Sequence, residues 1–97
     1  MPTYITLVNW TDEGIKNVKE SPKRLAAFKQ AVQNSGGKVV GFYLTMGRYD
    51  MVLIAEGTSD EVAASQMLSV ASQGSVRTET LKAFTEEEYR EIISKVA

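Results

Sequence analysis

The sequence contains no cysteine and no histidine among its 97 residues. Without cysteine, disulfide bonds and thiol chemistry are excluded. Without histidine, the commonest general base and metal ligand is missing, which excludes zinc sites, imidazole-ligated haem and His-dependent catalytic triads. We therefore predict neither a metal site nor a bound cofactor.

An excess of charge of either sign is also missing, because the sequence has 11 basic and 12 acidic residues. A nucleic-acid partner usually requires a basic face, and we predict no such partner. The basic residues Lys19, Lys23, Arg24 and Lys29 fall in a helical stretch beside Glu20. This mixture is typical of a solvated helix face.

Long apolar runs are absent as well. No stretch approaches the roughly 20 residues of a membrane span, and the N-terminus shows no basic segment followed by an apolar run, as a secretory signal would. A chain of 97 residues with 43% hydrophobic content is enough for one core and too short for two. The prediction is a single soluble domain over residues 1–97, cytoplasmic and with no membrane partner.

The most informative segment is a predicted β-hairpin in the middle of the chain. Residues 39–45 and 51–56 are rich in Val, Ile, Phe and Tyr, which favour a pleated, half-buried surface. The connection between them contains Gly47, which has the backbone freedom that a tight reversal needs. The same connection contains Arg48, Tyr49 and Asp50. These three side chains can form hydrogen bonds, and two of them carry a charge.

The remaining elements follow from local patterns. Residues 3–10 and 75–83 alternate as strands, and mixed charges in the second suggest an edge position. Residues 12–20 and 22–34 are expected as two helices, with Ser21 capping the second before Pro22. Thr58 and Glu61 have capping-box spacing at the start of another helix, and Thr85 begins a last, C-terminal one.

The order is therefore β-α-β-β-α-β followed by an extra C-terminal helix. This order predicts a ferredoxin-like α+β fold, with a four-stranded antiparallel sheet and helices on one face. Alternation assigns six large side chains to the uncovered face: Tyr4, Val8, Trp10, Tyr43, Val52 and Ile54. So much exposed apolar surface is unusual for a soluble monomer, so we expect a homodimer or a higher homo-oligomer.

Three segments resemble the GYD domain family: residues 43–50, which include Gly47-Arg48-Tyr49-Asp50, residues 15–24 and residues 76–84. They occur in the expected order and together span nearly the whole chain. The resemblance implies the dimeric α/β barrel, a group that includes ligand sensors, small monooxygenases and isomerases. It also implies that the chain forms homo-oligomers. It implies no particular reaction, because no activity is established for the family.

Catalytic candidates are Asp50, Tyr49 and Tyr43, gathered near the hairpin turn. A carboxylate facing a barrel interior could act as a general base while a tyrosine donates to an oxyanion. Alternatively, Asp50 caps turn amides or pairs with Arg48 or Arg77.

Five residues are candidates for ligand binding: Trp10, Tyr43, Arg48, Tyr49 and Asp50. The aromatic ones could equally be packing in a dimer core. The favoured hypothesis is a small-ligand-binding or oligomerisation module with no established activity. The alternative is a cofactor-independent enzyme, of monooxygenase or isomerase type, acting on a small aromatic or carbonyl compound.

Overall fold

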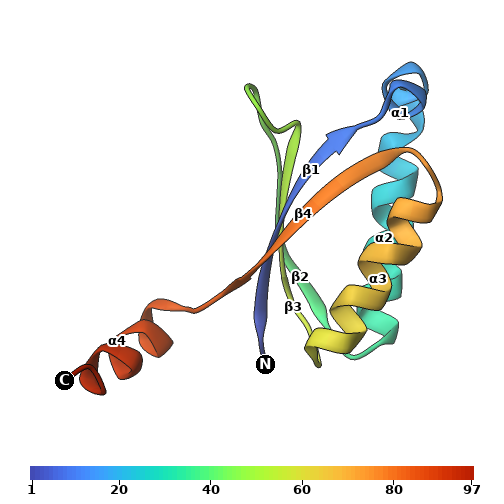
Figure 1. The fold of residues 1–97 in the computed structure, drawn as a ribbon. Helices are drawn as coiled ribbons and strands as arrows, with labels where there is room; N and C mark the ends of the chain where they lie inside the picture. The colour runs from blue at the N-terminus through green and yellow to red at the C-terminus, as the bar shows by residue number, and fades with distance from the viewer.

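The computed structural model describes residues 1–97 and contains four strands, four α-helices and one 3₁₀ helix (Figure 1). In chain order these are β1 (Thr3–Trp10), α1 (Asp12–Lys16), the 3₁₀ helix η1 (Val18–Glu20), α2 (Ser21–Asn34), β2 (Lys38–Leu44), β3 (Met51–Glu56), α3 (Asp60–Ser72), β4 (Val76–Ala83) and α4 (Glu86–Ser94). The predicted order of elements is confirmed.

The four strands form one antiparallel sheet in the order β2-β3-β1-β4. The hairpin strands β2 and β3 are neighbours, and β4 lies at an edge, as the mixed charges in it predicted. Helices α2 and α3 both lie on the same side of the sheet (Figure 1). The architecture is the ferredoxin-like α+β fold, in which two crossovers around a hairpin place both helices on one face.

The register decides which side chains of β1 face the helices. Thr6 pairs with Leu53 and Val8 pairs with Met51, and directly opposed residues share a face. Leu53 and Met51 are both 5% exposed, and Thr6 Oγ1 lies 3.9 Å from the sulfur of Met67 on α3. The even-numbered residues of β1 therefore lie under the helices.

This register corrects the prediction for half of the uncovered face. Tyr4, Val8 and Trp10 lie on the helix side, while Ile5 and Leu7 lie on the open side. Tyr43, Val52 and Ile54 are on the open face as expected, since Tyr43 pairs with Val52 and Ile54 with Ile5. Both faces of β1 are apolar, so alternation defines two sets of side chains without deciding which one the helices cover.

The connection from β1 to α2 also differs from the prediction. In place of one helix over residues 12–20, α1 ends at Lys16 and η1 follows it. Ser21 is not an extended cap, because it has helical dihedral angles (φ −57°, ψ −44°) and is the first residue of α2. The chain thus passes from η1 directly into α2, and the helix start has no side-chain cap. Pro22 is tolerated there because first-turn amides have no partner within the helix.

Helix α1 is held against the turn between α3 and β4. Thr11 donates its backbone amide to the Ser75 carbonyl over 3.0 Å, and its hydroxyl lies 2.6 Å from the Gly74 carbonyl oxygen. Gly14 approaches the same turn so closely that an added Cβ would lie 1.9 Å from the Ser75 carbonyl oxygen. A residue without a side chain is therefore required at position 14.

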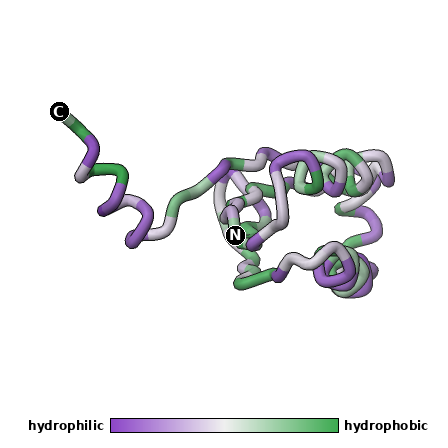
Figure 2. Tube along the Cα trace, turned by 90° about the horizontal axis from the view of Figure 1, so that it is seen from below, coloured by the Kyte–Doolittle hydropathy of each residue, from purple (hydrophilic) through white to green (hydrophobic).

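Helix α4 stands apart from the rest of the domain in both views (Figures 1 and 2). It begins with a complete capping box between Thr85 and Glu88, which explains why so short a helix has a defined start. Green and purple segments alternate along it in Figure 2. Its apolar side chains Tyr89, Ile92 and Ile93 are all exposed, so the helix has an apolar stripe that nothing in the chain covers.

Candidate functional site

The hairpin turn gathers some of the predicted site residues, but not all. Its backbone is closed by the Thr45 amide, which donates to the Asp50 carbonyl over 2.8 Å, and by the Thr45 hydroxyl, 2.6 Å from the Tyr49 carbonyl oxygen. Gly47 has a φ of +120°, a region that side chains disfavour. Gly47 thus supplies the backbone conformation that the reversal of the chain requires, as predicted.

Asp50 is engaged with the backbone of the neighbouring strand. Its Oδ2 accepts a hydrogen bond from the Trp10 amide over 3.0 Å. Its own amide donates to the Val8 carbonyl at 2.9 Å and to Asn9 Oδ1 at 3.0 Å. These bonds tie the end of the hairpin to β1. They are the kind of contact expected if Asp50 organises the fold, although its partner amide lies in β1 and not in the turn.

Tyr49 and Arg48 form a small polar cluster with β4. The Tyr49 hydroxyl donates to Glu79 Oε1 over 3.0 Å. The Arg48 guanidinium lies over the Tyr49 ring, 5.3 Å from its centroid, a geometry typical of cation–π attraction. Arg48 Nη2 also donates a hydrogen bond to the Tyr49 hydroxyl over 3.4 Å. This bond, together with the attraction to Tyr49, raises the pKa of Arg48 above its ordinary value, so this group stays cationic.

Tyr43 lies on the open face and is directed away from the turn. A Cβ built on Gly41 would lie 3.3 Å from the Tyr43 ring, which shows that the ring covers Gly41. Gly41 is farther from the turn than Tyr43 itself, so the ring does not converge with Asp50. The predicted grouping of Tyr43, Tyr49 and Asp50 around one reacting atom is therefore not what the geometry provides.

The Trp10 side chain is separated from the other four candidates by the sheet. It lines a cavity of about 320 Å³ between the sheet and helices α2 and α3. The apolar side of this cavity includes Phe28 from α2, Leu53 from β3 and Val70 from α3. Arg24 and Ser75 lie in the same lining, and Arg24 Nη1 donates to Ser75 Oγ over 2.5 Å.

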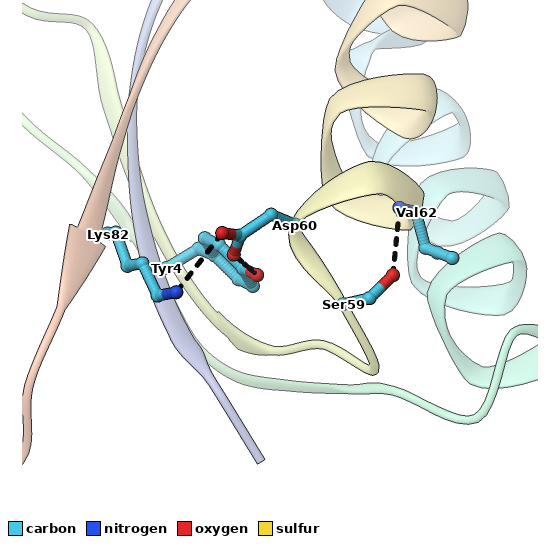
Figure 3. Close-up of polar contacts among 5 residues, drawn as sticks. All are labelled: Tyr4, Ser59, Asp60, Val62 and Lys82. Carbon is cyan, nitrogen blue, oxygen red and sulfur yellow. Dashed lines mark hydrogen bonds and ion pairs between the residues drawn. The ribbon is translucent and has the colours of Figure 1, made fainter.

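A second polar cluster, unforeseen from the sequence, links Tyr4, Asp60 and Lys82 (Figure 3). The Tyr4 hydroxyl donates to Asp60 Oδ1 over 2.5 Å, and Lys82 Nζ lies 3.1 Å from Asp60 Oδ2. Asp60 is the first residue of α3, whose cap Ser59 accepts a hydrogen bond from the Val62 amide (Figure 3). The capping-box spacing predicted Thr58 in that role, but the cap lies one residue later.

Burial raises the pKa of Tyr4 to about 12, and the hydrogen bond to Asp60 adds to this effect. The same hydrogen bond, together with that from Lys82, lowers the pKa of Asp60. The phenol therefore stays protonated and the carboxylate stays charged at neutral pH. No local pattern could have revealed this cluster, because Tyr4 and Asp60 are 56 residues apart.

The open face of the sheet is an apolar surface that the domain itself does not cover. The central strands contribute Ile5, Leu7, Val52 and Ile54 to it. From β4, Leu81 joins them as the partner of Ile5 and is 44% exposed. The Arg48–Tyr49–Glu79 cluster marks the polar end of this face.

No group of three or more acidic side chains lies close enough together to form a metal site. None of the helices is long and apolar enough to cross a membrane. The class of protein is thus a small α+β domain of ferredoxin-like fold, with one open sheet face and a cavity between the sheet and helices α2 and α3. Comparison with known proteins identifies the family.

The model of the GYD domain matches residues 4–93, so this chain belongs to the GYD domain family. It is 38% identical over 84 residues to a protein of Thermus thermophilus named glutamine synthetase and cystathionine beta-lyase binding protein. That match covers 86% of this chain and 88% of the relative.

Two solved structures are similar in fold. One is a crystal structure of a protein from Thermus thermophilus, with a TM-score of 0.54, 25% identity and coverage of 88% of this chain and 95% of that one. The other is the feast or famine regulatory protein from M. tuberculosis complexed with L-methionine, with a TM-score of 0.66 and 15% identity. The match covers 88% of this chain and 51% of that regulator, and the likeness shows the shared fold.

Proposed function

We propose that this chain is a homo-oligomeric binding module that acts through protein–protein contacts, with an enzyme of the glutamine synthetase or cystathionine β-lyase class as its partner. The observation that carries the proposal is the open sheet face, with aliphatic side chains on both central strands. An apolar surface of this kind on a small domain is typical of an interaction site. The name of the Thermus relative supplies the class of partner.

Self-association is proposed to occur first, with the open faces of two copies packed together as a dimeric α/β barrel. Helix α4 supports this arrangement, because its exposed residues Ile92 and Ile93 form an apolar stripe beyond the edge of its own sheet. In a dimer, α4 would reach the partner copy. Tyr43 and Tyr49, both presented on the open side, would belong to the same interface as aromatic anchors.

Catalysis is not part of the proposal. A general base needs a free carboxylate oriented toward a substrate, whereas Asp50 accepts a hydrogen bond from the Trp10 amide. Tyr43 and Asp50 do not point to one place. These contacts therefore support a binding role over the alternative of a cofactor-independent enzyme.

The test is a direct binding measurement with the purified chain immobilised and the two enzymes of the same organism as separate analytes. Saturable binding of at least one enzyme at micromolar concentrations is expected. Two matched variants replace an aliphatic residue with lysine: Val52→Lys on the open face and Leu68→Lys on α3, where Leu68 is 72% exposed. Val52→Lys should weaken binding by removing the dimer, while Leu68→Lys should not. Failure of both enzymes to bind would overturn the choice of partner.

A further inference from the structure

The cavity between the sheet and helices α2 and α3 is independent of the proposed interaction surface, because it lies on the opposite side of the sheet. Its volume of about 320 Å³ falls within the range of small-molecule sites. Twelve of its 21 lining residues are hydrophobic. The cavity is open to solvent at its rim, where Arg24, Ala27 and Gln73 are exposed, so a ligand can reach it from solution.

Arg24 is the only charged residue in the lining. Arg24 is exposed, as are Lys19, Lys23 and Lys29, with which the sequence grouped it on a solvated helix face, but Arg24 alone of the four lines the cavity. The ion pairs of the structure involve Lys82, Arg90 and Lys95 with their acidic partners. Arg24 thus has no carboxylate partner, and its hydrogen bond to Ser75 Oγ uses one of its five N–H groups.

Other polar groups gather around Arg24 at the same end of the cavity. Ser21 precedes it by one turn of α2, and Gln73 lies two residues before Ser75; both line the cavity. The Trp10 backbone pairs with Val76, the residue after Ser75, so the indole belongs to this end too. Farther from Arg24, the lining includes the apolar residues Phe42, Leu53 and Met67, with the Thr6 hydroxyl beside them.

We propose that this cavity binds a small amphipathic monocarboxylate, with the carboxylate on the Arg24 guanidinium and an apolar tail among the side chains beneath the helices. A guanidinium matches a carboxylate with two parallel hydrogen bonds. Because the cavity contains one cation and no second positive charge, it suits a monoanion better than a phosphate dianion. The apolar lining selects an aliphatic or arylalkyl tail over a polar one.

The fluorescence of Trp10 reports directly on the site, because Trp10 is the only tryptophan in the chain and lines the cavity. The wild-type protein is titrated with octanoate, with 1-octanol as the uncharged probe of the same chain length and with inorganic phosphate as an anion without a tail. Octanoate is expected to change the fluorescence saturably. Octanol should bind about tenfold more weakly or worse, and phosphate should not compete.

Two charge variants on the same turn of α2 test the role of Arg24. Arg24→Gln should weaken octanoate binding by about tenfold or more while leaving octanol binding unchanged. Lys23→Gln, which removes an adjacent charge outside the cavity lining, should leave both unchanged. Since Arg24→Gln also alters the contact with Ser75, its unfolding midpoint is measured alongside.

Ala27→Leu provides an independent test that keeps Arg24 in place. It adds an isopropyl group in the cavity lining and should weaken binding of octanoate and octanol together. The proposal is overturned if octanoate gives no saturable change, if octanol binds as tightly as octanoate, or if Arg24→Gln and Lys23→Gln weaken binding equally. It is also overturned if Ala27→Leu binds octanoate as the wild type does.

Discussion

Tyr4 illustrates at the residue scale how one polar atom can decide the orientation of a strand. Its ring is 7% exposed and packs against Gly57, where an added Cβ would lie 3.0 Å from the ring. Its hydroxyl reaches Asp60 at the start of α3. A buried phenol without a partner would be costly, so this contact accounts for a tyrosine beneath the helices while aliphatic Ile5 lies on the open face.

The raised pKa of Tyr4 predicts a loss of stability in alkali. The folded state holds the phenol proton more tightly than the unfolded chain does. The stabilisation is therefore fully present below pH 10 and declines as the pH rises toward 12. Tyr4→Phe has no proton to lose. In urea denaturation across this window, the wild type should lose more free energy of unfolding than Tyr4→Phe, and equal losses would contradict the prediction.

Asp50 predicts a contrast between two substitutions. Asp50→Asn keeps an oxygen that can accept from the Trp10 amide and should cost on the order of 1 kcal/mol or less. Asp50→Ala leaves that amide without its partner and should cost about 1–3 kcal/mol. Chemical denaturation of both variants measures the difference. If both lose the same free energy of unfolding, the hydrogen bond does not contribute to stability.

The starts of α2 and α3 differ at the element scale. The Ser59 hydroxyl accepts a hydrogen bond from the Val62 amide at 3.2 Å, whereas Ser21 makes no such bond because it lies inside α2. Ser59→Ala should therefore destabilise the domain by about 0.5–2 kcal/mol. Ser21→Ala should stay within about 0.5 kcal/mol of the wild type. Urea denaturation of the two variants tests this, and a larger loss for Ser21→Ala would contradict the observed helix start.

Helix α4 is the element whose formation owes least to tertiary contacts. The pKa of Glu88 is lowered because its carboxylate accepts the backbone amide of Thr85, which completes the capping box. An ion pair between Arg90 and Glu86 at i,i+4 spacing adds further local support. These contacts lie within a few residues, so the sequence sufficed to predict this helix, although not where it would lie.

At the scale of the whole molecule, the open face and the exposed stripe of α4 predict self-association. Size-exclusion chromatography with light scattering should return at least twice the monomer mass for the wild type at micromolar concentration. Val52→Lys should return the monomer, because a charge buried in an apolar interface is costly. Leu68→Lys should behave as the wild type. A wild-type monomer would contradict both the proposed homo-oligomer and the proposal that this homo-oligomer binds an enzyme.

Local patterns by themselves determined the order of elements, the hairpin with its Gly47 reversal, the edge position of β4 and membership of the GYD domain family. Each of these depends on residues close together in the chain. Turn chemistry, strand alternation and helix capping act over a few positions, so they can be recognised without knowing how distant segments meet.

Tertiary structure alone decided which face of β1 the helices cover, and with it the position of Trp10. It also decided that Arg24 meets Ser75, 51 residues away, and that Tyr4 meets Asp60. Alternation has a period of two and is satisfied equally by either face. The choice depends on which set of side chains fits the docked helices and satisfies their polar groups, and these contacts exist only once the chain has folded.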